Sequence, residues 1–387
     1  MSVIVTDARY RMSLSVIRSL GETGHRVIAA EERGISPVDA LGFHSRFVSE
    51  RAFTASSRTS PDSFIHDLMG LGEEGDVLIP VSLSSILAVA REISEVRERF
   101  HVALPSLDAI QIANDTERLL KVASRLGLRV PRTEEAAPGD DPGRLISRLK
   151  FPVVVKYREG EALALPPERR YAIVENPSEF ASVYTRMAAI QASPLVQEYI
   201  RGDGWGMSAV LDASSKPAMV FCHRRIREYP VTGGPSCFCE SVRDEHLIEM
   251  SLRLLRELKW YGVAMVEWKR ESATGDYVLM EINPRFWGSL PLSAAAGLNF
   301  PDALRRVAMG EDAGSPPAYK TGVRMRYLFQ DLLSVTGYLR RVPNKAAFLT
   351  GFVKDLLDPR VVDGVFRLKD PLPGLFYLAR ALGKRNT

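Results

Sequence analysis

The first hundred residues alternate short apolar runs with a stretch of helical spacing. The run at 2–7 (SVIVTD) is rich in β-branched residues, and residues 13–25 place apolar side chains at helical intervals before a second apolar run begins. The connections are too short for anything except a parallel strand–helix–strand crossover. Two further buried runs, DVLIPVS and HVALPS, continue the pattern. This part of the chain therefore predicts an open α/β domain.

The next part of the chain mixes helices and strands in an α+β order. The stretch at 108–133 (DAIQIANDTERLLKVASRLGLRVPRT) has the spacing of one helix, which Gly127 and Pro131 would close. Short apolar runs then predict strands at 151–157 and 194–200. We expect the second of these strands to run into a loop punctuated by glycines (GDG).

Two strand pairs follow, with an amphipathic helix between them. Residues 206–226 predict two strands around a polar turn, and 261–283 predict two strands around the turn SATGD. The helix is expected over 244–260. Neither the dinucleotide pattern G-x-G-x-x-G nor the P-loop pattern G-x-x-x-x-G-K-[ST] occurs, so neither of these phosphate sites is predicted.

The second strand pair brings two carboxylates to one face. A hairpin that is symmetric about its turn sets Glu267 opposite Glu281, and strict alternation puts Leu279, Glu281 and Asn283 on one side. Facing carboxylates repel, and burial in an apolar sheet adds a desolvation cost. Three explanations stay open: one carboxylate is protonated, Arg285 or another basic residue pairs with them, or they bind a divalent cation. Mg²⁺ takes oxygen ligands, commonly carboxylates together with phosphates.

Two other polar residues end predicted strands. Lys156 ends the strand at 151–157, where it either extends to solvent or serves as a point charge for a nucleotide phosphate. Glu198 lies where a strand passes into a loop, a place that suits either a plain strand exit or the binding of an adenine and a ribose.

Composition and charge exclude several classes of protein. The chain has 387 residues, 45% hydrophobic and 25% charged, which is enough for two or three domains with their own cores. The formal net charge of +4 gives no indication of a nucleic-acid partner. No segment approaches the roughly 20 apolar residues of a spanning helix, and the N-terminus lacks a signal-peptide pattern. We therefore expect a cytoplasmic protein that binds no nucleic acid.

The order of five segments resembles the ATP-grasp superfamily. In chain order these segments are FPVVVKY, LVQEYIRGDG, HRRIREYPVTGGPS, GVAMVEW and LMEINPRFWGS. The last segment is the most specific of the five. The resemblance covers about residues 1–310. Within the superfamily, the chain most resembles carboxylate–amine ligases related to the carbamoyl-phosphate synthase large subunit.

The resemblance implies a fold class and a domain order. The fold would be α/β and α+β: an open pre-ATP-grasp α/β domain at 1–112, then an ATP-grasp fold that clamps ATP between antiparallel sheets. Its subdomain A, with the linker helix and the lid, would cover 113–200, and its subdomain B, with the metal and catalytic residues, 201–314. Residues 315–387 would form a mostly helical C-terminal extension packed on the body, with contact to a protein partner or an anionic membrane as a second interpretation.

The resemblance also implies roles for single residues. The metal ligands, for Mg²⁺ or alternatively Mn²⁺, would be Glu267, Glu281 and Asn283. The catalytic residues near the transferred phosphoryl group and the acid substrate would be Arg285, Arg225 and Arg227. The ATP-binding residues would be Lys156, Glu198, Tyr199, Ile200, Asp203, Gly233 and Gly234.

The implied reaction joins a small carboxylic acid to an amine, with an amino acid as one candidate substrate. ATP would phosphorylate the acid, and the amine would displace phosphate from the acyl phosphate. Two alternatives remain open. One is an ATP-grasp enzyme with a thiol or another acceptor, and the other is a nucleotide-binding protein without catalysis. A homodimer is also left open.

Two features depart from the pattern of the family. Thr116 stands where many relatives have lysine, and the lid at 158–171 has one glycine and two prolines in place of a stretch rich in glycine and serine. If the lid does not bind phosphate through its backbone, Arg158, Arg169 or Arg170 would take this role.

Overall fold

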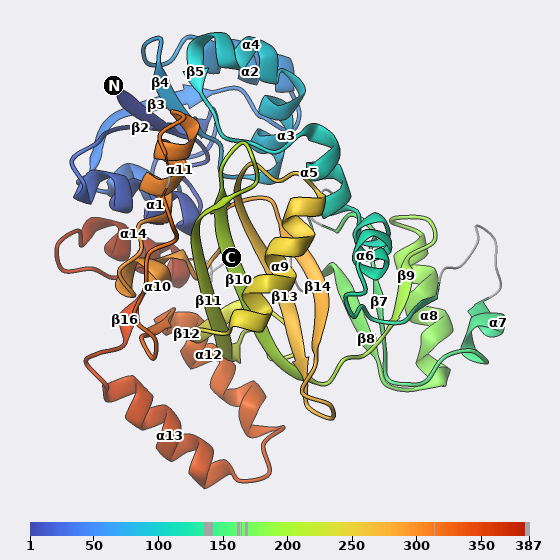
Figure 1. Ribbon diagram of the computed structural model, residues 1–387. Helices are drawn as coiled ribbons and strands as arrows, with labels where there is room; N and C mark the ends of the chain where they lie inside the picture. Colours follow the sequence, from blue (N-terminus) through green and yellow to red (C-terminus); the bar gives the residue numbers. More distant parts are fainter. Residues whose placement is uncertain (135–141, 161–162, 164, 167–168, 313, 384–387) are drawn as a thin grey trace.

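The computed structural model describes most of the chain (Figure 1), and its described strands form three sheets. The described residues are 1–134, 142–160, 163, 165–166, 169–312 and 314–383. The middle of the predicted lid therefore lies partly outside the described residues.

The first sheet is parallel, with five strands in the order β3-β2-β1-β4-β5. Its strands are β1 (Ser2–Val5), β2 (Arg26–Glu32), β3 (Val48–Thr54), β4 (Asp76–Ile79) and β5 (Phe100–His101). The accompanying helices are α1 (Arg11–Glu22), α2 (Pro61–Met69), α3 (Leu83–Arg91) and α4 (Ile93–Arg99), with a 3₁₀ turn η1 (Leu41–His44). The predicted open α/β fold with a parallel sheet is confirmed.

Two helices, α5 (Leu107–Asn114) and α6 (Thr116–Arg125), lead from the first sheet to the second. The sequence predicted one continuous helix here, but the chain breaks at Asp115. The Asp115 carboxylate accepts a hydrogen bond from the backbone N–H of Arg118 (3.0 Å) and thereby caps α6. The break directs the start of α6 toward the second sheet, where the backbone N–H of Thr116 donates to the carbonyl of Arg158 (3.1 Å).

The second sheet is antiparallel, in the order β6-β9-β7-β8. Its strands are β6 (Thr133–Glu134), β7 (Val153–Lys156), β8 (Tyr171–Val174) and β9 (Leu195–Glu198), and its helices are α7 (Pro142–Ile146) and α8 (Pro177–Ala188). One apolar core joins the sheet to α8, with Val155 and Phe180 fully buried in it. In Figure 1 this sheet lies to the right of the large third sheet.

The third sheet has seven strands in the order β14-β13-β10-β11-β12-β15-β16. They are β10 (Gly202–Leu211), β11 (Pro217–Glu228), β12 (Ser236–Val242), β13 (Gly262–Glu271), β14 (Tyr277–Asn283), β15 (Arg324–Arg326) and β16 (Val362–Asp363). The helices next to it are α9 (Glu245–Glu257), α10 (Leu290–Ala295) and α11 (Phe300–Ala308). Both predicted strand pairs are present, β10 with β11 and β13 with β14. The predicted GDG loop is wrong, because β10 begins at Gly202 and this stretch pairs with β13.

Alternation of side chains along the strands gives the third sheet two different faces. One face packs against α5, α6 and α9 through a core that includes Met207, Val266 and Trp268. On the other face, Val210 and Met265 join the core of the first domain. Farther along the strands this second face carries polar residues and turns toward the second sheet. One face of a single sheet therefore changes from apolar to polar along its length.

The β10 strand contributes glycines to that polar face. Because Gly204 and Gly206 have no side chains, His223 and Arg225 of the next strand, β11, lie flat across β10. A Cβ atom on Gly206 would be 2.3 Å from Cε1 of His223, and one on Gly204 would be 2.7 Å from Cδ of Arg225. Both approaches are far closer than van der Waals contact, so these glycines allow two large side chains to extend across the strand.

The C-terminal part of the chain packs on the body, as expected. It consists of α12 (Leu328–Leu339), α13 (Lys345–Leu357) and α14 (Leu372–Gly383), and the short strands β15 and β16 extend the third sheet. Arg227 of β11 holds the first two helices, because Nε donates to Asp331 (2.7 Å) and Nη1 donates to Asp355 (2.8 Å). The Arg18 guanidinium of α1 binds Asp370 just before α14 (2.8 Å).

We predict that Gly206→Ala destabilises the protein by about 1–3 kcal/mol, the usual cost of inserting a methyl group into a packed site. The His223 ring is almost fully buried and bonded to Ser289, so it has little room to move away. The free energy of unfolding from denaturant titration measures the effect. Ser208→Ala, on the same strand and the same face, is the matched control and should change little. Equal losses in the two variants would contradict the packing argument.

We predict that Arg227→Met costs about 3–5 kcal/mol of unfolding free energy, because it leaves the Asp331 carboxylate buried without its partner. The Arg227 and Asp331 side chains are only 6% and 2% exposed. The exposed pair of Arg243 and Glu245 provides the control, and Arg243→Met should cost about 0–1 kcal/mol. A loss in Arg227→Met no larger than in the control would show that the buried pair does not hold the helices.

Candidate active site

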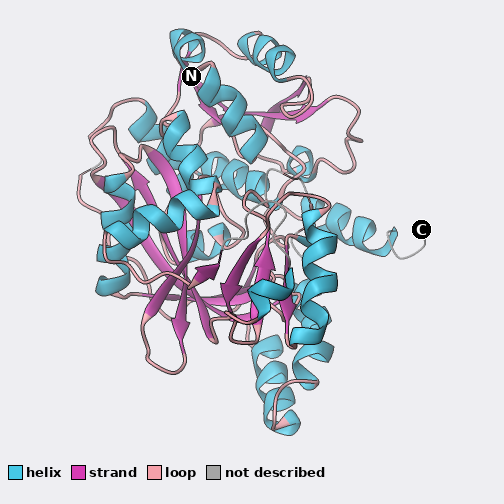
Figure 2. Ribbon diagram, turned by 90° about the vertical axis from the view of Figure 1, so that its right-hand side faces the viewer, coloured by secondary structure: helices cyan, strands magenta, loops and turns pink. Residues whose placement is uncertain are grey.

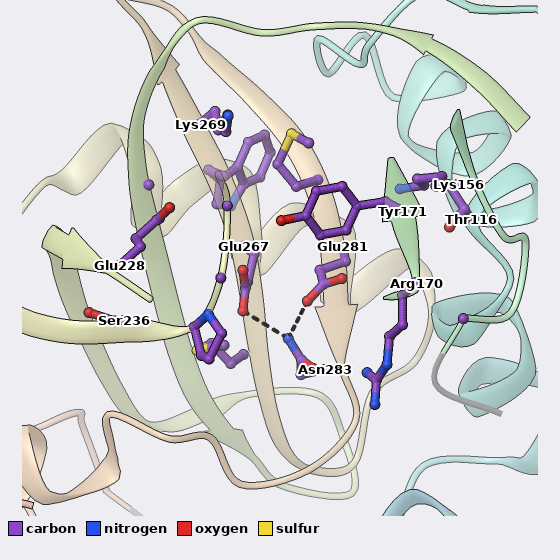
Figure 3. Close-up of a pocket in the computed structure, with 18 of the residues that line it drawn as sticks. Thr116, Lys156, Arg170, Tyr171, Glu228, Ser236, Glu267, Lys269, Glu281 and Asn283 are labelled. Carbon is purple, nitrogen blue, oxygen red and sulfur yellow. Dashed lines mark hydrogen bonds between the residues drawn. The ribbon is translucent and has the colours of Figure 1, made fainter. Parts of the chain in front are cut away.

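A cavity of about 380 Å³ opens between the second and third sheets (Figure 3). Strands β7 and β8 and the segment 197–200 form one side, and strands β10, β11, β13 and β14 form the other. The loops at 232–236 and 285–289 close two of its ends, and Arg11 at the start of α1 reaches it from the first domain. The cavity is therefore built from all three sheet regions of the fold.

The two predicted carboxylates face each other inside this cavity. Glu267 of β13 pairs in register with Glu281 of β14, and Met265 pairs with Asn283, as the symmetric hairpin predicted. The Asn283 amide donates to Oε1 of Glu267 (3.1 Å) and to Oε1 of Glu281 (3.0 Å). Figure 3 shows the three side chains pointing toward one another. This convergence was the geometric condition on which the metal hypothesis depended.

A bulge next to the pair changes the pattern of faces. The pairing steps from Glu267 with Glu281 to Trp268 with Leu279, which leaves Met280 as an extra residue. The prediction that Leu279 shares a face with Glu281 is therefore wrong, because Leu279 is buried in the core on the opposite side. Met280 instead lines the cavity beside Glu281.

An arginine from two strands away compensates the charge of Glu267. The Arg225 guanidinium of β11 crosses Gly204 and forms an ion pair with the Glu267 carboxylate, and it also lies 3.4 Å from Glu228. Of the bases considered from the sequence, Arg225 and not Arg285 makes this pair. Burial raises the pKa of Glu267 to about 7. The loss of hydration and the nearby negative charge of Glu281 both raise this pKa, and together they exceed the lowering effect of the Arg225 charge.

The opposite wall presents Lys156, which faces the carboxylates from the end of β7. Burial lowers the pKa of its ammonium group, and the charge of Glu281 partly offsets this effect. Tyr171 of β8 pairs in register with Lys156 and extends its ring into the cavity (Figure 3). Thr116 lies behind Lys156 at the same wall. A cation and a phenol thus face the two carboxylates across the space.

The segment after β9 forms the far end of the cavity. Glu198, Tyr199 and Ile200 all line it, and Lys269 of β13 fixes their backbone by donating to the Ile200 carbonyl (3.0 Å). The Lys269 ammonium also lies 5.0 Å from the centre of the Tyr199 ring. The Glu198 carboxylate accepts from the backbone N–H of Arg132 (2.9 Å), so part of its function is to join β9 to the chain before β6.

The glycine loop lines the cavity, but its amides point elsewhere. The N–H groups of Gly233 and Gly234 both donate to the Pro230 carbonyl, at 3.4 and 2.8 Å. Gly233 has φ +124°, and a Cβ on Gly234 would meet the backbone of Tyr229 at 2.3 Å. The two glycines therefore permit a tight turn beside Tyr171 and, in this arrangement, offer no free amide to a phosphate.

Two predicted site residues lie away from the cavity. Arg227 is turned to Asp331 and Asp355 by register shifts on either side of it, so it acts in holding the C-terminal helices. The resemblance implies that Arg227, like Arg225, lies near the acid substrate, but this irregular stretch of β11 turns Arg227 away from the cavity. Asp203 is exposed on β10, while its neighbour Gly204 lines the cavity.

The remaining arginines considered from the sequence differ in their surroundings. Arg285 lines the cavity and donates to the Phe286 carbonyl (3.0 Å) and to the sulfur of Met12 (3.5 Å), which connects this loop to α1. Arg158 also lines the cavity, but its guanidinium forms an ion pair with Glu117. Arg170 also lines the cavity, and its guanidinium donates to the Leu165 carbonyl (2.8 Å).

Several cavity residues were not singled out from the sequence. They are Arg11, Tyr171, Glu228, Lys269 and Tyr327. Lys269 had a usable signal, because it follows Glu267 by two residues and strand alternation places both on one face. The others come from distant segments, for which a single sequence gives no pairing.

The donor set suits a hard cation such as Mg²⁺. Two carboxylates lie close enough for one amide nitrogen to reach both, and carboxylate oxygens are the ligands that Mg²⁺ prefers. No group of three or more histidine, cysteine, aspartate or glutamate side chains suited to a metal occurs among the described residues. The cation would therefore take its remaining ligands from water, an amide oxygen or substrate phosphates, as Mg²⁺ commonly does.

Comparison with known proteins supports one family. The model of a family described as ATP-grasp in the biosynthetic pathway with Ter operon matches residues 193–330. The carbamoyl phosphate synthase large chain of Thermotoga neapolitana is 27% identical over 234 residues, which is 58% of this chain and 20% of that protein. The chain thus spans about a fifth of the length of the curated relatives that it matches.

Solved structures share the fold at low sequence identity. The biotin carboxylase–β-γ-ATP complex of Campylobacter jejuni has a TM-score of 0.66 and 16% identity, over 84% of this chain and 74% of that chain. The L-amino acid ligase of Bacillus licheniformis has a TM-score of 0.57 and 12% identity, over 80% of this chain and 74% of that chain. The family model, the sequence relatives and these solved structures together indicate an ATP-grasp fold for this chain.

Proposed function

We propose that this protein is an ATP-dependent carboxylate–amine ligase that works through an acyl phosphate and releases ADP and phosphate. The observation that carries this proposal is the convergence of Glu267, Glu281 and Asn283 in one cavity that also holds Lys156 and Arg225. Among the similar solved structures, one is an L-amino acid ligase and another is a biotin carboxylase in complex with β-γ-ATP. These similarities support the reaction class and leave the acid and the amine open.

ATP would lie between the two antiparallel sheets. The adenine would occupy the end formed by Tyr199 and Ile200, whose backbone Lys269 holds in place. The phosphates would extend toward Lys156, whose buried ammonium is a point charge suited to phosphate oxygens. Arg170 is placed to approach the same phosphates from the lid side.

The acid substrate would bind near the arginines beside the carboxylate pair. One oxygen of its carboxylate attacks the γ-phosphorus, the bond from that phosphorus to the β-bridging oxygen breaks, and ADP leaves with the electron pair. Arg285 and Arg225 are placed to neutralise the charge that spreads over the transferred phosphoryl group. The amine then attacks the carbonyl carbon of the acyl phosphate, phosphate leaves, and the nitrogen loses a proton.

Glu267, Glu281 and Asn283 would hold Mg²⁺, with Mn²⁺ as a substitute, and the bound cation would neutralise phosphate charge during the transfer. Arg225 already pairs with Glu267, so it keeps that carboxylate oriented toward Glu281. The Asn283 amide bridges the two carboxylates and limits their separation. The protein thereby positions the oxygen donors before a nucleotide binds.

We predict that ADP and phosphate appear in stoichiometric amounts only when both an acid and an amine are supplied with Mg-ATP. A coupled ADP-release assay over amino acids and small carboxylic acids, with mass spectrometry of the product, tests this expectation. Release with neither substrate, or no release with any pair although ATP binds, would contradict the ligase assignment.

We predict that Glu281→Gln lowers turnover at least about a hundredfold, because changes even to the partners of metal ligands cost 10–100-fold. Glu271→Gln, at the far end of β13 where it pairs with Arg129, is the control and should keep its activity. The ADP-release rate at saturating ATP and Mg²⁺ gives the comparison. An unchanged rate in Glu281→Gln would remove the metal assignment.

A further inference from the structure

Exposed apolar side chains gather in the C-terminal helices. Most of the large apolar side chains that are exposed in the described residues belong to this part of the chain. They are Leu332, Leu333, Leu349, Val353, Leu357, Leu368, Leu372 and Leu375. A concentration of this kind on one region of a protein marks a surface that contacts something.

The exposed residues of α13 follow the spacing of one helical face. Leu349, Val353 and Leu357 are separated by four residues each and are 41%, 49% and 75% exposed. The inner face of the same helix presents Phe348 to Tyr338 of α12 and buries Phe352. The helix is thus apolar on both faces, although among the described residues only the inner face packs on the body.

Basic residues flank this outer face. Arg340 and Arg341 directly follow α12, Lys345 begins α13, and Lys354 lies next to Val353 in the chain. All four are exposed. In the part of the chain that the structure describes, no carboxylate forms an ion pair with Arg340, Lys345 or Lys354. The hairpin face is defined here as Leu349, Val353 and Leu357 of α13 with the four basic residues Arg340, Arg341, Lys345 and Lys354.

The acidic residues of the two helices have other partners. Asp331 and Asp355 hold Arg227 of the sheet, and Asp358, just past α13, holds Arg360. The carboxylates therefore attach the hairpin to the body or pair locally, while the lysines and arginines are left at the surface. This separation of charges makes the hairpin face both apolar and cationic.

We propose that the hairpin face binds an anionic lipid surface. Helices with leucine and valine on one side and lysine or arginine beside them lie in the interface of a bilayer, with apolar side chains among the acyl chains and cations at the headgroups. No helix in the described residues is long and apolar enough to cross a membrane, so the contact would be peripheral. Figure 1 and Figure 2 both place α13 at the bottom of the molecule, beyond the sheets.

A second copy of the chain fits this face less well. In a two-fold dimer the same patch meets itself, so Arg340, Lys345 and Lys354 of both copies would approach one another. The hairpin face contains no carboxylate to balance these basic residues. Like charges that approach one another at a dimer interface repel. An anionic bilayer supplies the missing negative charge along the whole face. This proposal does not depend on the ligase reaction.

Sedimentation of the full-length protein with lipid vesicles tests the proposal. We expect binding to phosphatidylcholine vesicles that contain phosphatidylglycerol, and little binding to phosphatidylcholine alone. Binding should fall when NaCl rises from about 0.1 M to about 1 M, because the screening length shortens from about 10 Å to about 3 Å. Lys345→Glu with Lys354→Glu should weaken binding at least about tenfold, since each basic residue near such a surface contributes measurably.

An apolar variant and a matched control complete the test. Val353→Ser with Leu357→Ser should also weaken vesicle binding, while Ile190→Ser, which changes a residue 54% exposed elsewhere, should not. ADP release should be unchanged in all these variants. Equal binding to both kinds of vesicle, or unchanged binding in both hairpin variants, would overturn the proposal. A dimer in light scattering that the same substitutions dissociate, without vesicle binding, would assign the face to a subunit contact.

Discussion

The structure depends on holding two carboxylates, Glu267 and Glu281, face to face in a partly buried sheet. Like charges in this position repel and lose hydration, so the arrangement needs compensation from nearby groups. The Asn283 amide bridges the pair, and Arg225 reaches Glu267 from the second strand away. That reach is possible because Gly204 leaves the intervening strand without a side chain there. A short sequence feature of β10 thus sets the electrostatics of β13 and β14.

The same sheet face serves two purposes along its length. Near Val210 and Met265 it packs into the core of the first domain, and near Glu267 it forms a wall of the cavity. The first domain is therefore fixed beside the site, and Arg11 and Met12 of α1 contact it directly. The C-terminal helices are attached through Arg227, which register shifts turn away from the cavity that Arg225 enters. Arg225 and Arg227, which are two positions apart on one strand, thus have separate functions.

Regular periodicity made much of this fold predictable from the sequence. The parallel sheet, the hairpin and the register of Glu267 with Glu281 follow from apolar patterns and a recognisable turn. What failed depended on irregularities that periodicity cannot reveal. A bulge moved Leu279 to the opposite face, and shifts in β11 separated Arg227 from Arg225. The sequence predicts a loop at the glycines of β10 because glycine disfavours strands in general, whereas in the structure these glycines allow large neighbouring side chains to cross the strand.

The central claim is that the facing carboxylates bind a divalent cation. Electron paramagnetic resonance of Mn²⁺, titrated into the protein with ADP and then displaced by Mg²⁺, measures this binding directly. The account predicts bound Mn²⁺ that Mg²⁺ displaces, with an affinity that falls about tenfold or more in Glu267→Gln. The same Mn²⁺ affinity in the protein and in that variant would contradict the claim.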